Sequence, residues 1–84
     1  MWRIVFTHRA RKDLMLLDKD AASQIIKKLE KAAENPEKSF EKVTGFNYYK
    51  TRAGDYRAIA VLDFKLKIIE VRRAGHRKKI YKNL

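Results

Sequence analysis

Apolar and polar residues alternate along this chain with two different periods, which predicts both strands and helices. Residues 2–6 are mostly β-branched or aromatic, so they predict a first strand, with Trp2 and Phe6 in the core. Thr7 then stands where a helix N-cap would stand. Residues 8–17 predict a first helix, because apolar residues recur there at helical spacing: Ala10, Leu14 and Leu17. This helix leaves three side chains for solvent: Arg9, Lys12 and Asp13.

A second helix is predicted directly after the first. Asp18 or Asp20 can cap its start, and Asn35-Pro36 stops it, because proline cannot continue a helix. Its apolar stripe keeps the 3.6-residue period through Ala22, Ile25, Ile26, Leu29 and Ala33. The two helices therefore predict a helical hairpin.

The remainder of the chain predicts a loop and then strands. Residues 37–47 show no clear period, so we expect a loop that tucks Phe40, Val43 and Phe46 onto the core. Gly75 is expected to break the last strand, and residues 76–84 form a basic tail with room for one helical turn. Turn residues separate three segments of strand type: 48–53, 56–62 and 66–73.

The order of these elements predicts an α+β fold of the type βααβββ, in a single domain that spans residues 1–84. Both amphipathic helices need one common apolar surface, so we expect the hairpin to cover one face of an antiparallel sheet. The opposite face is then open, polar and cationic, and a basic tail follows the last strand.

Charge is distributed unevenly along the chain. The formal net charge is +11; residues 43–84 carry 11 basic and 3 acidic side chains, whereas residues 1–42 carry 10 and 7. An anionic partner would relieve this excess, so nucleic acid is the first expectation and an acidic protein the second. No apolar run approaches the ~20 residues that span a bilayer, and the N-terminus does not resemble a signal peptide, so we expect a cytoplasmic protein.

Few residues suit a metal or redox site. The chain has no cysteine, and its two histidines, His8 and His76, lie far apart in the sequence. Disulfides, thiolate catalysis and zinc sites built from cysteine are therefore excluded. We expect neither a metal nor another cofactor.

Three cations of the second half are predicted to gather on one strand face. Alternation puts Lys50 and Arg52 on the same side, and Arg57 joins them if it pairs with Arg52 across the turn. This register also places Ile59 and Val61 on the cationic face, which requires a cover. The three cations are either solubility charges on a solvated face or a binding site. Their mutual repulsion favours a site that a phosphate neutralises.

A second basic set lies near the C-terminus: Arg72, Arg73, His76, Arg77, Lys78 and Lys79. Folding of the tail past Gly75 would direct Arg77 and Tyr81 toward the first set. Other readings remain open, because Lys78 and Lys79 also suit a frayed charged terminus and Tyr81 also suits core packing. Tyrosines of the strands, such as Tyr48, suit packing better than base stacking.

Two sequence blocks resemble the signature blocks of the RelE/ParE toxin family. They are YKTRAGDYR at residues 49–57 and RAGHRKKIY at residues 73–81, and the predicted order of elements is similar to that family's as well. The resemblance implies the toxin of a type II toxin–antitoxin pair, bound by an acidic antitoxin. Resemblance to the RelE branch further implies a metal-free endoribonuclease that cleaves messenger RNA in the ribosomal A site and inhibits translation.

That resemblance implies a functional set of five residues: Lys50, Arg52, Arg57, Arg77 and Tyr81. Cleavage requires the 2′-OH deprotonated, the phosphate's added charge stabilised and the 5′-oxygen protonated. Lys50 is then the candidate base, and the arginines of the first set hold the phosphate. Arg77 or His76 would stand near the leaving oxygen, and Tyr81 would stack on a base. The other basic residues near the C-terminus would bind RNA.

Two other functions fit the same sequence. The ParE branch of the family poisons DNA gyrase, and gyrase-linked DNA breaks with intact messenger RNA would indicate that activity. A nucleic-acid-binding module without catalysis would bind with salt-dependent affinity and cut nothing when ribosomes are supplied.

Overall fold

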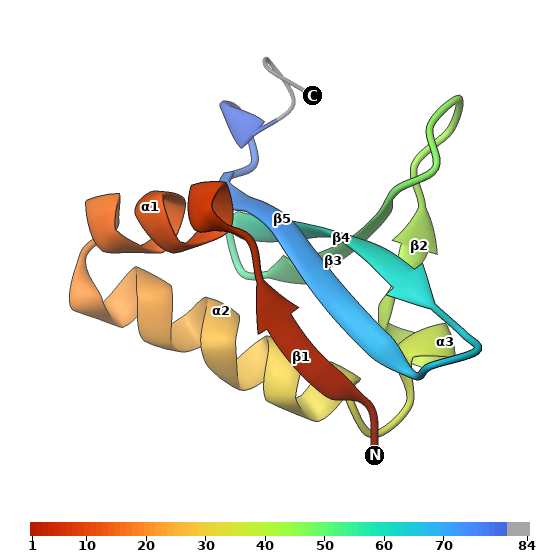
Figure 1. The fold of residues 1–84 in the computed structure, drawn as a ribbon. Helices are drawn as coiled ribbons and strands as arrows, with labels where there is room; N and C mark the ends of the chain where they lie inside the picture. The colour runs from red at the N-terminus through yellow and green to blue at the C-terminus, as the bar shows by residue number, and fades with distance from the viewer. Residues whose placement is uncertain (81–84) are drawn as a thin grey trace.

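A five-stranded sheet carries the fold, with two longer helices packed against it (Figure 1). The computed structural model describes residues 1–80. Across the sheet the strand order is β1-β5-β4-β3-β2. In chain order the elements are β1 (Arg3–Phe6), α1 (His8–Leu16), α2 (Lys19–Ala32), α3 (Pro36–Ser39), β2 (Glu41–Lys42), β3 (Tyr49–Ala53), β4 (Tyr56–Asp63) and β5 (Ile68–His76).

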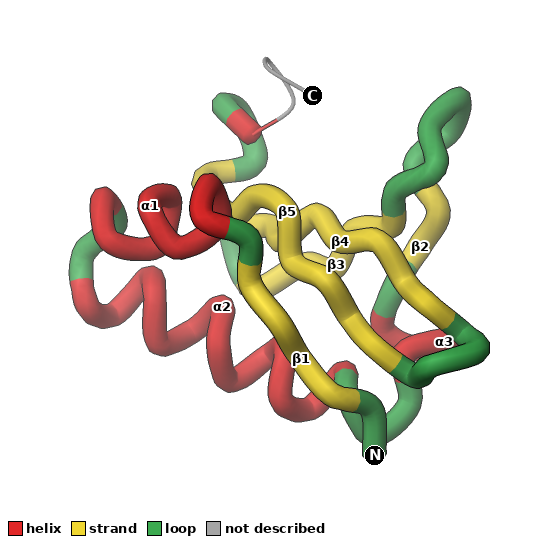
Figure 2. The backbone as a smooth tube through the Cα atoms, viewed as in Figure 1, coloured by secondary structure: helices red, strands yellow, loops and turns green. Residues whose placement is uncertain are grey.

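The predicted α+β class and the antiparallel meander of β3, β4 and β5 are confirmed. One pairing differs, because β1 lies parallel to β5 and the sheet is therefore mixed rather than antiparallel. Between these two strands the chain passes through both helices and the rest of the sheet, as the tube in Figure 2 shows. A parallel neighbour requires such a long crossover, which short-range alternation does not reveal.

Both helix starts agree with the predicted caps. Thr7 accepts a hydrogen bond from the Ala10 amide at 3.1 Å, and Asp18 accepts one from the Ala21 amide at 2.9 Å. Asp18, rather than Asp20, is thus the cap of α2. Each bond satisfies an amide that has no partner inside its helix, which typically contributes about 1 kcal/mol.

The core lies between the helices and one face of the sheet. α1 packs against β5 and β1, whereas α2 packs against β3 and β4. The stripe that α2 buries is Ala21, Ile25, Leu29 and Ala32. The prediction that Ile26 belongs to this stripe is wrong, since 40% of its surface is exposed. On the sheet, small and branched residues meet the helices: Ala58, Ala60, Ile69 and Val71.

The segment predicted as a loop at residues 37–47 contains the short helix α3 and the two-residue strand β2. Phe40 is buried as predicted, but the prediction for Phe46 is wrong, because 48% of its surface is exposed. The strand β2 pairs only with Tyr49 and Lys50 of β3. The connection at residues 43–48 therefore projects from the sheet (Figure 1).

Two predictions near β5 are also wrong. Gly75 does not break the strand, which runs to His76, because Gly75 pairs with Arg57 within the ladder. Asp13 does not face solvent, since its side chain is only 10% exposed and lies against β5. Within residues 1–80, no helix combines the length and the apolar character that crossing a bilayer requires.

Candidate functional site

The predicted register of the β3–β4 hairpin is confirmed. Arg52 pairs with Arg57, and Lys50 pairs with Ile59. The intervening Thr51 is buried, so it occupies the helix side of β3. Lys50, Arg52 and Arg57 therefore share the face that points away from the helices. Ile59 is fully buried although it belongs to this cationic face.

These three cations line one cavity of about 260 Å³. β2 pairs with only two residues of β3, so the rest of β3 has no strand beside it on that edge. The cavity opens at this place. Its full lining consists of Lys28, Lys38, Ser39, Glu41, Lys50, Thr51, Arg52 and Arg57. Five cations thus surround one carboxylate, and we call this cavity the cationic cavity.

Each cation of the strand face is held differently. Lys50 Nζ lies 3.8 Å from Glu41 Oε2 in an ion pair that solvent reaches, which contributes at most about 1 kcal/mol. Arg52 Nε donates a hydrogen bond to the Gly54 carbonyl at 2.9 Å. Arg57 Nε is buried and has no hydrogen-bond partner among the described residues.

The unpaired polar atoms point to the chemistry of this cavity. Within residues 1–80, two buried side-chain atoms lack a partner, Arg57 Nε and Thr51 Oγ1, and both residues line the cationic cavity. An unsatisfied buried donor costs about 1–3 kcal/mol. An anion neutralises positive charge and accepts hydrogen bonds from guanidinium and ammonium groups, so the five cations of this cavity suit a phosphate.

Sequence reasoning missed five of the lining residues: Lys28, Lys38, Ser39, Glu41 and Thr51. The sequence could have indicated Lys28, because it is adjacent to Leu29 of the buried stripe and therefore lies at the boundary between α2 and the sheet. For Lys38 and Ser39 there was none, because they belong to a segment without a clear period. Glu41 is the one carboxylate of the lining, and it was not recognised.

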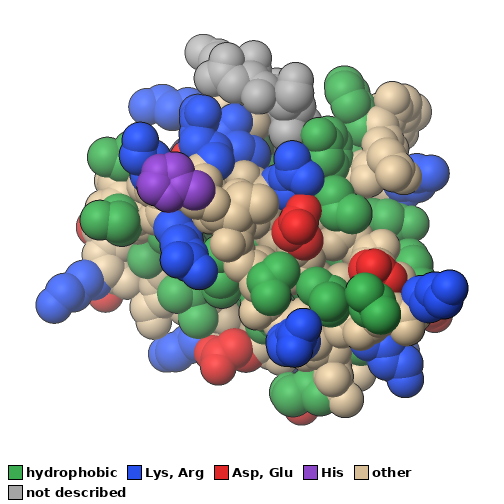
Figure 3. Space-filling view, viewed as in Figure 1, with side chains coloured by type: hydrophobic (Ala, Val, Ile, Leu, Met, Phe, Trp, Pro, Cys, Tyr) green, Lys and Arg blue, Asp and Glu red, His purple; other side chains and the backbone are tan. Residues whose placement is uncertain are grey.

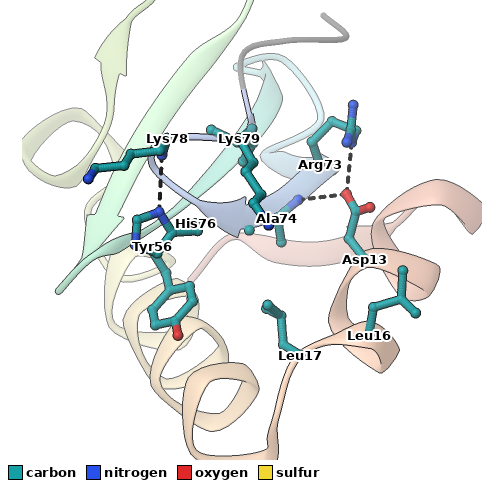
Figure 4. A pocket seen from close by; sticks show the side chains of 11 residues that line it. Asp13, Leu16, Leu17, Tyr56, Arg73, Ala74, His76, Lys78 and Lys79 are labelled. Atoms are coloured by element: carbon teal, nitrogen blue, oxygen red, sulfur yellow. Dashed lines mark hydrogen bonds and ion pairs between the residues drawn. The ribbon is translucent and has the colours of Figure 1, made fainter.

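Two arginines of the C-terminal basic set are held by carboxylates. Arg72 forms an ion pair with Glu70 at 3.0 Å. Arg73 Nε donates to Asp13 Oδ2 at 2.8 Å, and the same oxygen accepts the Ala74 amide at 3.0 Å (Figure 4). The register shifts between Ile59 and Ala60, so Arg72 is an extra residue of β5. A β-bulge of this kind bends the strand that carries the extra residue and changes the direction of the side chains there.

Three other members of this set line a second cavity, of about 540 Å³, between α1 and the end of β5 (Figure 4). They are His76, Lys78 and Lys79; Arg73 also lines this cavity, whereas Arg77 does not. His76 Nδ1 accepts a hydrogen bond from the Lys78 amide at 3.2 Å, and its ring packs edge-on against Tyr56. Figure 3 shows more Lys and Arg side chains than Asp and Glu side chains on the face drawn, in line with the formal net charge of +11.

Arg77 lies at the junction of the two sets. Its amide donates to the Asp55 carbonyl at 2.9 Å, which extends the β4–β5 register one step beyond His76. Arg77 is not among the residues that line the cationic cavity. Tyr81 lies outside the described residues, so its predicted direction toward the first basic set stays a prediction.

Comparison with known families and structures gives one consistent picture. The family model described as "ParE toxin of type II toxin-antitoxin system, parDE" matches residues 4–81. A search of curated proteins gave no match. A likeness in fold is found to the RelBE2 toxin–antitoxin complex of Mycobacterium tuberculosis, with a TM-score of 0.81, 20% identity, and coverage of 90% of this chain and 98% of that one.

Two further solved structures are more similar in sequence. The intact RelBE complex of E. coli has a TM-score of 0.75 and 26% identity, and the match covers 90% of this chain and 96% of that one. The RelB–RelE complex of Methanococcus jannaschii has a TM-score of 0.72 and 28% identity, with 95% and 98% covered.

Proposed function

Because the chain belongs to the RelE/ParE family of toxins from type II toxin–antitoxin systems, we propose that it is a ribosome-dependent endoribonuclease that cleaves messenger RNA without a metal. One observation carries this proposal. The cationic cavity is lined by five cations, and two of its lining residues hold buried polar atoms without a described partner. A bound phosphodiester would relieve the repulsion among the five cations and accept hydrogen bonds from their side chains.

The roles of the residues follow from the charge that develops during cleavage. Attack of the 2′-oxygen on the phosphorus adds negative charge to the phosphate, and Arg52 and Arg57 are the donors that stabilise it. The 5′-oxygen departs with a proton, for which Arg77, His76 or the ribosome is the expected source. Tyr81 is expected to orient a base. Arg72, Arg73, Lys78 and Lys79 are expected to bind the RNA backbone.

Two groups at the cavity compete for the role of proton acceptor. Lys50 and Glu41 lie 3.8 Å apart, so the two form a single unit in the apo protein. A Lys50→Met variant and a Glu41→Gln variant separate them, because only loss of the true base removes the acidic limb of the pH–rate profile, where the rate rises as the base loses its proton.

The proposed partner in the cell is a small acidic antitoxin. The neighbours from E. coli and M. jannaschii were solved as complexes of RelE with RelB. A toxin with a net charge of +11 suits an acidic partner, since complementary charge speeds association and lowers the cost of like charges.

Primer extension on a message translated by purified ribosomes tests the proposal. Wild-type protein should cut the message at defined positions only when ribosomes are present, because the cavity lacks a full set of catalytic groups of its own. Arg57→Met should lose the cuts. Lys65→Met, which removes one exposed charge at the turn between β4 and β5, should keep them. Intact messages with wild-type protein would refute the proposal.

A second activity is favoured by the family model, which bears the name of ParE. Members of that branch poison DNA gyrase. Incubation of the toxin with gyrase, ATP and supercoiled plasmid separates the two activities: our proposal predicts no excess of broken plasmid, whereas broken plasmid together with intact messages would assign the chain to the gyrase poisons.

A further inference from the structure

The connection between β2 and β3 carries an aromatic pair that packs outside the core. It projects from the body of the molecule at residues 43–48 (Figure 1). The rings of Phe46 and Tyr48 are stacked, with centroids 6.2 Å apart and planes 25° apart. Phe46 remains 48% exposed, so one part of its surface faces solvent. Neither ring belongs to the buried cluster between helices and sheet or to the residues packed against it.

Backbone hydrogen bonds hold this connection in a defined shape. The Val43 amide donates to the Tyr48 carbonyl at 2.8 Å, which extends the β2–β3 ladder, and the Phe46 amide donates to the Val43 carbonyl at 3.1 Å. Gly45 adopts φ = 82°, a value that glycine reaches without strain. The aromatic pair is thus part of a fixed turn.

Tyr48 precedes by two residues Lys50, which lines the cationic cavity. Side chains of an extended strand alternate, so Tyr48 points to the same side as Lys50 and Arg52. At about 3.3 Å per residue, the Cα atoms of Tyr48 and Lys50 are about 7 Å apart. A nucleotide whose phosphate sits in the cavity can therefore reach the aromatic pair with a base.

We infer that the Phe46–Tyr48 stack is a platform for one unpaired base of the RNA strand whose phosphate occupies the cationic cavity. Every base has a π-face, so an exposed aromatic ring beside a cationic groove suits single-stranded RNA of varied sequence. This inference rests on the proposed function for its ligand, RNA. It adds a second contact between the protein and the RNA, which positions the RNA strand along β3.

Binding of a short single-stranded RNA tests the inference without any cleavage step. The probe contains 2-aminopurine at successive positions, one per oligonucleotide, and a 2′-deoxy sugar at every residue that could be cut. Wild-type protein should bind the probe and quench 2-aminopurine at one position, where the base stacks. Phe46→Ala and Phe46→Leu should lower the affinity about tenfold and abolish that quenching. Phe46→Trp should retain both.

Salt dependence distinguishes stacking from charge. Phe46→Leu removes no charge, so the slope of log affinity against log salt should equal that of the wild type, whereas Arg57→Met should reduce it by about 0.7. Phe46→Leu with wild-type affinity and full quenching would overturn the platform, as would wild-type protein that does not bind the probe. Quenching of 2-aminopurine by a protein that leaves messages intact would refute the proposed nuclease activity and support the proposed stacking of a base on Phe46 and Tyr48.

Discussion

Replacement of Arg57 by methionine should stabilise the free toxin and at the same time abolish its activity. Most substitutions of a partly buried residue destabilise a protein, so this prediction runs against the usual direction. It follows from the environment of Arg57, whose Nε is buried without a described partner and whose strand neighbour across the turn is Arg52.

The expected gain can be worked out from these two contributions. An unsatisfied buried donor costs about 1–3 kcal/mol, and like charges directly opposite in a sheet cost about 0.2–1 kcal/mol. Methionine keeps an unbranched stem that fills the same space. Because Arg57 is only partly buried, we take the lower part of this range, a gain of about 1–2 kcal/mol. For a domain of this size each kilocalorie raises Tm by about 4–8 °C.

Urea unfolding monitored by circular dichroism measures this gain, with Arg52→Met as the matched control. Arg52 is exposed and donates to the Gly54 carbonyl, so its replacement removes a hydrogen bond that contributes about 0.5–1.5 kcal/mol. Relief of the same like-charge repulsion, about 0.2–1 kcal/mol, offsets part of this loss, so Arg52→Met should give no net gain. An Arg57→Met variant that unfolds at lower urea than the wild type would refute the reasoning, as would an equal gain from Arg52→Met.

Three substitutions test how the scaffold holds the cavity, each through the free energy of unfolding in urea. Leu29→Ala, at a fully buried position of α2, should cost about 2–5 kcal/mol, because it leaves a cavity in the core. Asp13→Ala should cost at least about 2 kcal/mol, because it removes a charged hydrogen bond and leaves Arg73 against the sheet without its carboxylate. Gly54→Ala should cost about 1–2 kcal/mol, because Gly54 has φ = 63° and a Cβ there would lie 2.6 Å from the Gln24 amide nitrogen.

Each of these has an internal check. Gly45→Ala at φ = 82° meets no described atom within 4 Å, so it should cost less than Gly54→Ala; the reverse order would show that the contact with Gln24 is unimportant. Asp13→Asn retains the shape and an acceptor oxygen and should cost less than Asp13→Ala. A Leu29→Ala variant as stable as the wild type would mean that the helix does not pack as described.

The parts of the fold that sequence predicted are those that local signals specify. Thr7 and Asp18 cap helices because their side chains reach amides three residues away. The two-residue turn at Gly54-Asp55 sets the pairing of Arg52 with Arg57, since Gly54 supplies the positive φ that a tight hairpin requires. The cationic face of β3 follows from this turn and from alternation alone.

The parts that sequence missed depend on residues far apart in the chain. Asp13 looks like a solvent-facing helix residue, and its burial is explained by two partners on β5, Arg73 and the Ala74 amide, which lie 60 and 61 residues later in the chain. The same holds for the wall of the cationic cavity that Lys28 and Lys38 supply, because no period relates these residues to β3. Tertiary contacts of this kind override local patterns.

A crystal structure of the toxin with a short RNA that carries a 2′-deoxy sugar at the cleavage position tests the central claim most directly. We expect the scissile phosphate in the cationic cavity, within about 3 Å of the Arg57 guanidinium nitrogens and beside Lys50. A phosphate held instead by His76, Lys78 and Lys79 between α1 and the end of β5, with nothing bound near Arg57, would contradict it.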